Sequence, residues 1–540
     1  MFYQNVSELL MVNVRRYPRK TAVIHRDVRL SYEEFNRQIN RMAHMLLDMG
    51  VKAGHKVAYM FPNSIMLLAA YYAVQKIGGV AVPLNFRLVP RELQYLLEAS
   101  DASVLLFDAQ FLAHVEEISG AFGDRVSFLC SEVSDAWGPS IRERMEGQPE
   151  GEPALFADGE ALSRIQFTGG STGLPKGAMR THSADICEAM GVMNSNMMGS
   201  DPDHVVLIQC PLEHHGGHSW YLSAFASGAT LVICDVFDPE TILGLIEKER
   251  VTYLMLLPPS TYLRLLDCPG LGEFDLSGVR LVQSAAGCTT PEIVEKIYAA
   301  FPNCVMNYGW GQTESGLGTS LVLTRQMAKE NLSRIKSVGR PMPFLEAIVA
   351  DEDGKELPPG RIGECLVKSP AVMKGYYRQP ELTKKAFGDD GWLRTGDLMW
   401  KDEDGYLYLM SRKKDMIKSG GENVFAQEVE GVIKRHPAVL ECVVFGVPER
   451  AMGEAVMAVV SLRPGHTLTL KEVQDHCRQY ISSYKKPRYL DFIDEFDMDD
   501  AGKIRKSRVA ERYRLKLRNE KRRAKGLLPV GGGSHCMEEE

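Results

Sequence analysis

The chain has 540 residues, of which 45% are hydrophobic and 25% charged. This composition is ordinary for a globular protein, and the length predicts about three or four folding units. The net charge of −7 at pH 7 excludes a strongly basic chain that coats nucleic acid, so no nucleic-acid partner is expected.

The cysteines and the apolar runs both favour a cytoplasmic protein. Eleven cysteines occur singly and without a CxxC pair, which argues against a disulfide framework or a structural zinc site. The N-terminal stretch lacks the long apolar core and the small-residue cleavage site of a signal peptide. The longest apolar run, Ile65–Val74, has about half the length that a membrane-spanning helix needs, so no transmembrane segment is expected.

The first 110 residues alternate between helical and strand patterns. Helical periodicity predicts helices over Tyr32–Met49, Ser64–Ile77 and Pro90–Ala99. Short apolar runs predict strands over Lys56–Met60, Val80–Val82 and Ser103–Phe107. The alternation recurs later, with strands expected over Val205–Ile208, Thr230–Ile233, Tyr253–Leu257 and Val279–Val282. Strands that alternate with helices predict parallel sheets covered by helices.

The pattern changes near Ser337, where glycine, proline and short β segments dominate. An antiparallel or barrel-like unit is predicted by strand patterns over Glu346–Ala350, Glu364–Val367 and Gly405–Met410. A compact α+β pattern follows Arg412, with elements expected over Gln427–Lys434, Val439–Val447, Val456–Leu462 and Lys471–Ile481. The basic stretch from Glu511 to Lys525 is interpreted as a solvated terminal helix, with binding of an acidic partner as the alternative.

A glycine-rich loop follows the strand-like segment Arg164–Phe167. The segment from Thr168 to Gly177, TGGSTGLPKG, combines three hydroxyls, little side-chain bulk and one cation. An anion of two or three phosphates needs these features, because glycine lets backbone N–H groups approach it closely. The spacing is not that of a Walker A loop, and no GxGxxG run indicates a dinucleotide site. The candidate phosphate-binding residues are Thr168, Gly169, Gly170, Ser171, Thr172, Gly173 and Lys176.

This loop resembles the phosphate-binding signature of the adenylate-forming superfamily, which includes acyl-CoA synthetases, adenylation domains of peptide synthetases and luciferases. Gly169 stands where the family commonly has serine, so the backbone donor is kept and one hydroxyl is lost. Further segments resemble other family signatures in the same order, and the resemblance extends from near residue 5 to near residue 510.

The segment WGQTE, from Trp310 to Glu314, resembles the family's aromatic-Gly-x-Thr-Glu motif. The resemblance implies that Trp310 stacks on adenine, that Thr313 contacts the α-phosphate, and that Glu314 binds Mg²⁺. Thr172 is the second residue assigned to the metal. The resemblance also assigns to the nucleotide site Gly311 and Gln312 of this motif and, in a wall facing the adenine, Ala285, Ala286 and Gly287.

Three later segments resemble signatures around the ribose, the hinge and the thiol tunnel of the family. Asp397 corresponds to an aspartate that accepts both ribose hydroxyls, a role suited to the two oxygens of a carboxylate. Arg412 corresponds to an arginine that also reaches the ribose, and Lys414 corresponds to the hinge residue. The loop beside the pantetheine tunnel corresponds to Ser419, Gly420 and Gly421.

Lys503 resembles the catalytic lysine of the C-terminal domain. It lies in the run Gly-Lys-Ile, after an approach that is more acidic than the family's usual one. Arg505 and Lys506 stand close by and are alternatives for the same role.

A histidine-rich segment follows Pro211. His214 resembles the histidine that closes the acyl pocket of the family, with Glu213 in place of the typical aromatic residue. The run from Glu213 to His218 contains three histidines and a carboxylate, so a metal site is the alternative, although its two glycines would weaken a helix. Many pocket candidates are small, which favours a deep slot; they are His214, Gly216, Gly217, Ala285, Gly287, Trp310 and Gly311.

The resemblance implies an α/β fold with a large N-terminal domain of two stacked αβ sheet subdomains plus a β-barrel-like subdomain. A small α+β C-terminal domain is expected to rotate about a hinge. The expected boundaries are 1–411 for the large ATP- and acyl-binding domain, 412–414 for the hinge, 415–515 for the small domain and 516–540 for a basic, then flexible tail. Homodimers are common in the family, so a homodimer is one expectation for the assembly.

The implied activity is that of an AMP-forming carboxylic acid–CoA ligase that uses ATP, Mg²⁺ and coenzyme A. ATP and the acid give an acyl-adenylate and pyrophosphate, and the CoA thiol then gives acyl-CoA and AMP. The expected substrate is a medium- or long-chain fatty acid or an aryl acid. The alternatives are an adenylation enzyme that loads a carrier-protein thiol, and a catalytically silent ATP- or acyl-binding module. The silent module is disfavoured because Lys176, Glu314 and Lys503 are all present.

Overall fold

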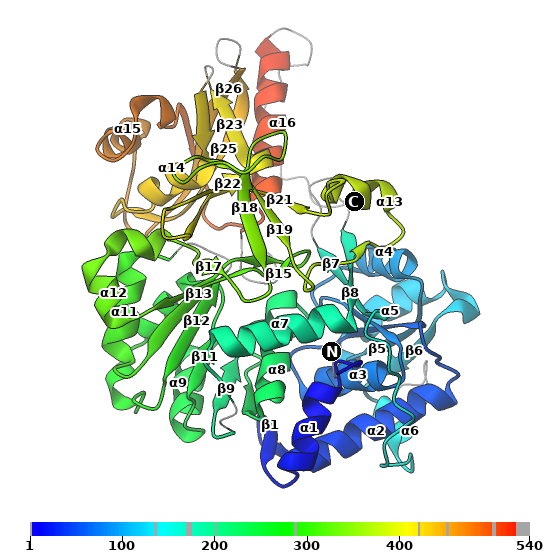
Figure 1. Cartoon of the computed structure of the whole chain (residues 1–540). Helices are drawn as coiled ribbons and strands as arrows, with labels where there is room; N and C mark the ends of the chain where they lie inside the picture. Colours follow the sequence, from blue (N-terminus) through cyan, green and yellow to red (C-terminus); the bar gives the residue numbers. More distant parts are fainter. Residues whose placement is uncertain are drawn as a thin grey trace. The chain divides into compact units, whose positions relative to one another are not determined.

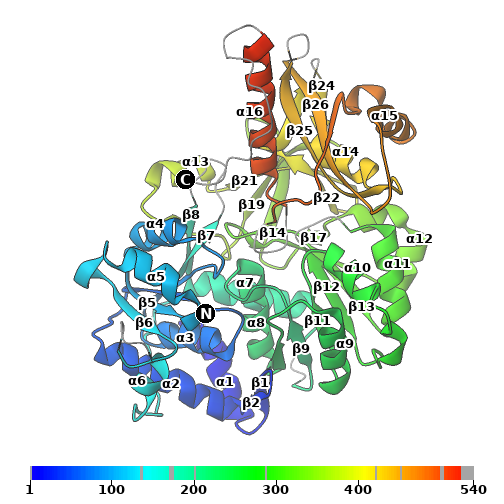
Figure 2. The same cartoon turned by 180° about the vertical axis from the view of Figure 1, so that it is seen from behind.

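The computed structural model describes residues 3–133, 138–168, 175–199, 202–285, 289–419, 422–449, 453–498 and 504–524. The chain forms two compact units (Figures 1 and 2). The first contains Met1–Thr395 and Met399–Leu409, and the second contains Gly396–Leu398 and most of the chain after Met410. Within the described ranges, every helix is too short or too polar to cross a membrane.

A nine-stranded sheet organises one half of the first unit. Its order is β17-β16-β13-β12-β11-β9-β10-β1-β2. The six strands from β13 to β1 run parallel, and β2, β16 and β17 pair antiparallel at the two edges. The strands are β1 Thr21–His25, β2 Val28–Ser31, β9 Val205–Ile208, β10 Thr230–Ile233, β11 Tyr253–Met255, β12 Leu281–Ala285, β13 Val305–Gly309, β16 Thr319–Leu323 and β17 Arg340–Pro341.

A seven-stranded sheet organises the other half, in the order β20-β8-β7-β4-β3-β5-β6. Strands β7, β4, β3, β5 and β6 run parallel, β8 pairs antiparallel with β7, and β20 pairs antiparallel with β8. The strands are β3 Lys56–Met60, β4 Val80–Pro83, β5 Ala102–Phe107, β6 Ser127–Cys130, β7 Leu162–Thr168, β8 Lys176–Thr181 and β20 Gly375–Tyr376.

Helices between the two sheets join them into one core. One cluster of buried side chains includes residues of both sheets and of these helices, which are α1 Glu8–Arg16, α2 Tyr32–Asp48, α3 Ile65–Lys76, α7 His182–Ser195 and α8 His215–Ser227. Helix α3 is buried on nearly all sides, which explains why its sequence is a continuous apolar run rather than an amphipathic one. Ser31 and Ser64 cap α2 and α3 through bonds from the backbone N–H of Glu34 and Leu67.

Further helices cover the outer faces of the two sheets. The seven-stranded sheet packs against α4 Pro90–Ser100 and α5 Leu112–Ser119. The nine-stranded sheet packs against α9 Pro239–Lys248, α10 Ser260–Leu266 and α11 Pro291–Ala300. The prediction of parallel sheets covered by helices is confirmed. The described cysteines are all free thiols.

The later part of the chain is rich in antiparallel β structure, as predicted. A four-stranded sheet consists of β18 Glu346–Ala350, β19 Gly363–Lys368, β21 Leu393–Lys401 and β22 Leu407–Arg412. The second unit has a five-stranded sheet of β23 Met416–Ser419, β24 Glu422–Phe425, β25 Val439–Glu449, β26 Gly453–Leu462 and β27 Tyr489–Phe492. One face packs against α14 Ala426–Ile433 and α15 Leu470–Arg478, and the other against α16 Lys506–Ala524.

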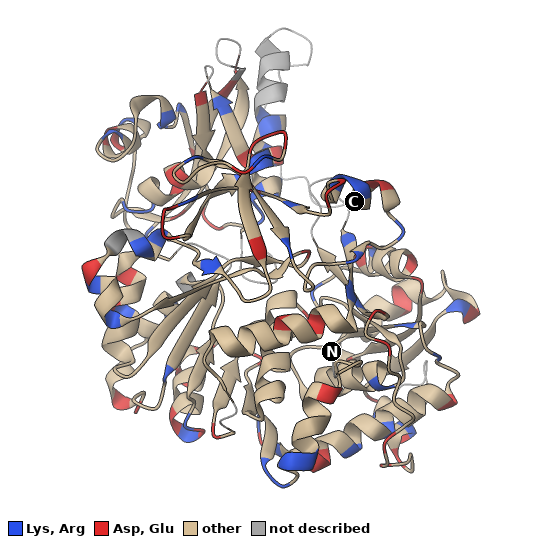
Figure 3. Ribbon diagram, viewed as in Figure 1, with Lys and Arg blue, Asp and Glu red and all other residues tan. Residues whose placement is uncertain are grey.

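Helix α16 contains most of the predicted basic terminal helix but begins earlier. Its cations pair with carboxylates of the same unit, at Lys506–Glu430 and Lys516–Asp491. Lys and Arg residues are interspersed with Asp and Glu over the elements visible in Figure 3. The described part of this helix packs on its own unit through Val509, Ala510 and Tyr513, and the role of the basic stretch stays a prediction.

His182, at the start of α7, makes the stability of the first unit sensitive to acid. Its side chain is fully buried, and Nδ1 accepts a bond from the backbone N–H of Val6. Burial lowers the pKa of His182 to about 4. As the pH falls, this histidine is therefore protonated in the unfolded chain before it is protonated in the folded one. The free energy of unfolding is expected to fall by about 3 kcal/mol between pH 6.5 and pH 4. The free energy of unfolding in urea, measured across this pH range, should fall less for His182→Gln than for the wild type. His466→Gln changes an exposed histidine and should behave as the wild type. The same pH dependence of the free energy of unfolding in all three proteins would contradict the prediction.

Candidate functional site

The predicted glycine loop connects two neighbouring antiparallel strands. Thr168 ends β7 and Lys176 begins β8, and the two residues are paired in register. The predicted residues Gly169, Gly170, Ser171, Thr172 and Gly173 lie outside the described residues. The Lys176 ammonium lies 5.3 Å from the centre of the Tyr376 ring, which lies on β20 of the same sheet.

The predicted aromatic-Gly-x-Thr-Glu segment forms a small hairpin, β14 Gly311–Gln312 and β15 Gly316–Leu317. Its tip brings Glu314 to the glycine loop: Glu314 Oε1 accepts a bond of 3.0 Å from the Tyr376 hydroxyl and one of 3.4 Å from the Thr168 hydroxyl. The structure therefore brings together three predicted residues, Thr168, Lys176 and Glu314, that are up to 146 positions apart. Sequence reasoning missed Tyr376, which has no motif of its own.

Two other predicted parts of the nucleotide site lie next to this hairpin. Trp310 is buried, and its backbone N–H bonds to the Thr319 hydroxyl. Ala285 ends β12 and pairs in register with Gly309 of β13, so it lies at the carboxyl end of the parallel sheet, where open α/β sheets bind ligands. Ala286 and Gly287 lie outside the described residues. Gln312 donates to the backbone carbonyl of Thr395, and Thr313 is buried.

The histidine-rich run forms the start of α8. His214 is the exposed N-cap, and its Nδ1 accepts a bond from the Gly216 N–H. Glu213, His215 and His218 are buried. Arg164 donates to His215 Nδ1 over 2.9 Å, so this nitrogen is already used as an acceptor. Among the described residues, no group of three or more His, Cys, Asp or Glu side chains could bind a metal ion.

Two of the predicted pocket glycines are required by close backbone packing rather than by a slot for the substrate. A Cβ on Gly217 would lie 2.2 Å from the carbonyl oxygen of Pro211, and one on Gly311 would lie 2.6 Å from that of Gly316. These contacts are with backbone, so the glycines are needed for close packing of the chain on itself. Gly216 is different, because its Cβ would meet only side-chain atoms, a Leu257 methyl at 3.4 Å and His214 Nδ1 at 3.8 Å. The interpretation of the small residues as a deep slot therefore does not extend to Gly217 and Gly311.

We predict opposite tolerances at the two neighbouring glycines of α8. Gly217→Ala is expected to destabilise the first unit by about 1–3 kcal/mol, since the backbone must move to accommodate the methyl group. Gly216→Ala should be neutral or stabilising, because alanine favours a helix by about 1 kcal/mol over glycine. Thermal unfolding of the two variants checks this pair. Similar melting temperatures for both would show that the Pro211 contact does not constrain Gly217.

The remaining predicted residues belong to the second unit. Asp397 is almost fully buried, and its carboxylate forms an ion pair of 2.6 Å with Arg412 Nε. Lys414 lies in a short 3-10 turn, η5 Lys413–Asp415, directly after β22, and Ser419 is the buried last residue of β23. Gly420, Gly421 and Lys503 lie outside the described residues. The structure thus pairs the two residues predicted to contact the ribose.

A network of four buried charges, Arg164, Arg180, Asp185 and Glu188, was not predicted. Arg164 and Arg180 both bond to Asp185 at 3.0 Å, and Arg180 also bonds to Glu188 at 2.6 Å. Burial alone would raise the pKa of Asp185, yet the two guanidinium groups keep it well below its usual range. The pKa of Glu188 is also lowered: burial opposes ionisation, but the Arg180 guanidinium and the Ser219 hydroxyl, which both donate to the carboxylate, outweigh it. In the sequence, Arg164 begins the strand-like segment Arg164–Phe167, but no motif marks any of the four residues.

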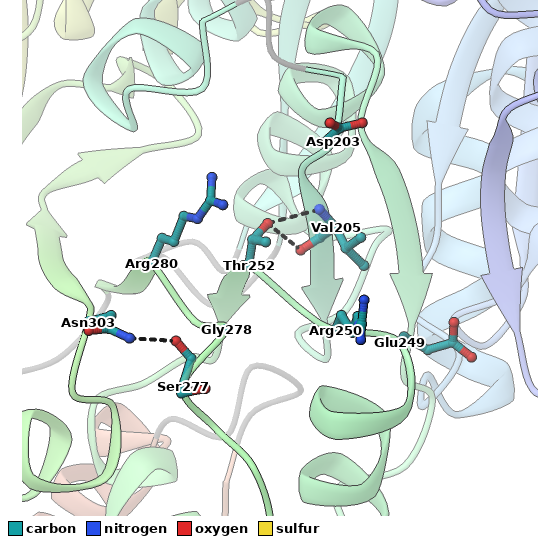
Figure 4. A pocket seen from close by; sticks show the side chains of 9 residues that line it. All are labelled: Asp203, Val205, Glu249, Arg250, Thr252, Ser277, Gly278, Arg280 and Asn303. Carbon is teal, nitrogen blue, oxygen red and sulfur yellow. Dashed lines mark hydrogen bonds between the residues drawn. The ribbon is translucent and has the colours of Figure 1, made fainter.

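A surface hollow of about 750 Å³ lies at the other end of the nine-stranded sheet, at the amino ends of β9, β11, β12 and β13 (Figure 4). Its lining is polar and mostly exposed. None of the residues predicted for the site line it; those that do are Asp203, Val205, Glu249, Arg250, Thr252, Ser277, Gly278, Arg280 and Asn303.

Comparison with known proteins identifies close relatives along nearly the whole chain. The family model for AMP-binding enzymes matches residues 10–377, and the one for their C-terminal domain matches residues 428–503. Feruloyl-CoA synthase of an Amycolatopsis species is 34% identical over 500 residues, 92% of this chain and 97% of the relative. Long-chain-fatty-acid–CoA ligase FadD13 of Mycobacterium tuberculosis is 32% identical over 513 residues, 94% and 99% of the two chains. The crystal structure of ATP-bound MatB from Rhodopseudomonas palustris matches with a TM-score of 0.84 and 30% identity, over 95% and 99% of the chains.

Proposed function

The chain belongs to the AMP-binding enzyme family and is an AMP-forming acid–thiol ligase, and from this premise we propose that it joins a fatty or an aryl carboxylic acid to coenzyme A. The proposal is supported most directly by the contact between Glu314 and Thr168, which joins two nucleotide motifs in one site. The relatives named above act, by their names, on an aryl acid and on long-chain fatty acids.

The chemistry requires that charge be neutralised rather than that the protein supply a nucleophile. A carboxylate attacks the α-phosphate of ATP, and pyrophosphate leaves; the thiol then displaces AMP from the acyl-adenylate. We assign the glycine loop and Lys176 to the departing pyrophosphate, and Asp397 with Arg412 to the ribose. Lys503 is assigned to the attacking carboxylate and the α-phosphate. Positioning and electrostatic stabilisation of this kind supply most of the rate enhancement in phosphoryl and acyl transfer.

The residues at the hairpin tip fit a magnesium ion. Mg²⁺ is commonly bound by one or two carboxylates together with substrate phosphates, so the Glu314 carboxylate beside the Thr168 hydroxyl is a suitable donor set. When bound, the ion would offset the charge of the phosphates. Tyr376 orients the carboxylate by donating to its Oε1. On the family resemblance alone, we propose Thr172 as a second contact of the ion, and Gly420 and Gly421 as part of the loop beside the pantetheine arm of CoA.

The test is pyrophosphate release with ATP and Mg²⁺ across a panel of acids, with and without CoA. The panel contains acetate, octanoate, palmitate, benzoate, a cinnamate and several amino acids. CoA-dependent turnover on a fatty or aryl acid would support the proposal and identify the substrate class. Release that does not respond to CoA would instead favour loading of a carrier-protein thiol. The absence of release with every acid would contradict the proposal.

A further inference from the structure

The carboxylate of Glu188 lies where three elements of the first unit meet. Its Oε1 accepts bonds from the Ser219 hydroxyl of α8, at 2.6 Å, and from the backbone N–H of Leu317 in β15, at 2.9 Å. His215 Nε2 of α8 lies 3.0 Å from the same oxygen, close enough for an electrostatic contact although outside hydrogen-bond geometry. Its Oε2 accepts the bond from Arg180. One side chain of α7 therefore contacts α8, the hairpin and β8.

The contact with the hairpin is close as well as polar. Gly316 precedes Leu317 and has φ +71°, and a Cβ placed on it would lie 3.3 Å from the Glu188 carboxylate. The turn therefore packs directly on the carboxylate, and the Leu317 N–H points at it. Glu314 lies two residues before Gly316, at the tip of the same hairpin. A displacement of the Glu188 side chain would therefore displace Gly316 and Leu317, and with them the turn that contains Glu314.

The contacts at the start of α8 determine which ring nitrogen of His215 carries the proton. His215 is next to His214, the histidine predicted to close the acyl pocket. An arginine can only donate, so His215 Nδ1 must accept the bond from Arg164, and the ring proton lies on Nε2. The Nε2 atom that carries this proton lies 3.0 Å from the Glu188 carboxylate. Burial lowers the pKa of His215, which agrees with a neutral ring in this one tautomer. His214, the N-cap of α8, is the adjacent residue.

Stability alone is a weak reason to bury this network. Replacing buried ion pairs by apolar residues of similar volume is often neutral or stabilising, because desolvation costs about as much as the attraction gains. Charged hydrogen bonds are instead short and directional, so they define distances between the elements that they join. The elements joined by Glu188 are the start of the acyl helix and the nucleotide hairpin.

We propose that Glu188 is a positioning residue that sets the distance between the acyl site at the start of α8 and the nucleotide site on the hairpin. Its carboxylate fixes both elements to α7, with Arg180 as its counter-ion. The reacting carboxylate and the α-phosphate are then aligned when both substrates bind. This inference rests on the proposed function for the identity of the two sites, while the contacts themselves do not.

The test compares Glu188→Gln with Asp185→Asn. Both changes remove one buried charge from the same helix and the same network without a change of shape. Asp185 bonds to Ser163, Arg164 and Arg180, and no bond to α8 or the hairpin is among its contacts. Burst amplitude of pyrophosphate release gives the active fraction, so that rates are compared per active site. Hydrogen exchange of the peptide that covers the hairpin gives a second readout that does not depend on activity.

For Glu188→Gln we expect adenylate formation per active site to fall by about 10²-fold, the usual result of misplacing reactants by about 1 Å, with KM values for ATP and acid little changed. The hairpin amides should exchange faster. Asp185→Asn should keep the wild-type rate per site and the wild-type exchange. Wild-type behaviour of Glu188→Gln, or equal losses in both variants, would overturn the proposal.

Ser219→Ala keeps the test decisive if the charge variants do not fold. This change removes one hydrogen-bond donor to Glu188 without removing a charge. We expect adenylate formation per active site to be several-fold slower and the hairpin amides to exchange faster. No change in either measurement would overturn the proposal. Failure of the proposed function is distinguishable, because the wild type would then release no pyrophosphate with any acid. Hydrogen exchange would still show whether Glu188 fixes the hairpin.

Discussion

Lys503→Ala is expected to reduce adenylate formation by at least about 10²-fold, the scale on which the loss of one charge-stabilising group lowers kcat. We propose that the ammonium bridges the attacking carboxylate and the α-phosphate. The second half-reaction starts from an acyl-adenylate that already exists, and it needs no such bridge. Thioester formation from supplied acyl-adenylate and CoA should therefore stay within a few-fold of the wild type. The two half-reactions are measured separately, by pyrophosphate release and by loss of free thiol.

Lys506→Met is the matched control for this prediction. Lys506 was an alternative for the catalytic lysine, but its ammonium bonds to Glu430 Oε2 of α14, a carboxylate that is nearly buried. Arg505, the other alternative, donates to the backbone carbonyl of Met498. Lys506→Met should therefore lower stability and leave adenylate formation per folded molecule unchanged. Equal loss of both half-reactions in Lys503→Ala, or selective loss of the first in Lys506→Met, would show that Lys503 is not the bridging residue.

Periodicity and capping predicted the long elements of the fold closely. The strands Lys56–Met60, Val205–Ile208 and Thr230–Ile233 were predicted with their observed bounds, and the helix predicted from Tyr32 begins there after its Ser31 cap. These segments are apolar and buried, so their patterns reflect the environment that they occupy. The strand predicted to start at Val279 begins instead at Leu281. Strand ends depend on pairing with distant partners, which a local pattern does not contain.

The site was predictable only where a motif marks it. The hairpin of Gly311–Gln312 and Gly316–Leu317 has two residues in each strand, too few for any periodic signal. Its residues were found through their resemblance to a family motif, whereas Tyr376 and Glu188 were missed. In the sequence, no motif distinguishes Glu188 from Asp185, the other acidic residue of α7. The proposed role of Glu188 depends on its bonds with Ser219 and Leu317, which are 31 and 129 positions away. These contacts can be seen only in the folded chain.

Glu314→Gln is expected to lower pyrophosphate release by about 10²-fold and to raise the Mg²⁺ concentration that gives half the maximal rate. Glutamine has the same shape and can still accept the bond from Tyr376, but it lacks the charge that a hard cation prefers. Binding of Mn²⁺ in the presence of ATP, followed by electron paramagnetic resonance, should weaken in parallel, which gives a readout independent of turnover.

Tyr376→Phe is the control that separates charge from orientation. It removes only the hydroxyl that donates to Glu314 Oε1, and it keeps the ring that lies 5.3 Å from the Lys176 ammonium. Because a hydrogen bond to a charged group contributes about 1.5 kcal/mol or more, activity should fall about ten-fold, with the Mg²⁺ dependence nearly unchanged. If both variants lost activity equally and neither altered the Mg²⁺ or Mn²⁺ dependence, Glu314 would serve to fix the hairpin tip against β20 rather than to bind the metal. A stronger metal dependence in Glu314→Gln alone would instead assign the carboxylate to the ion.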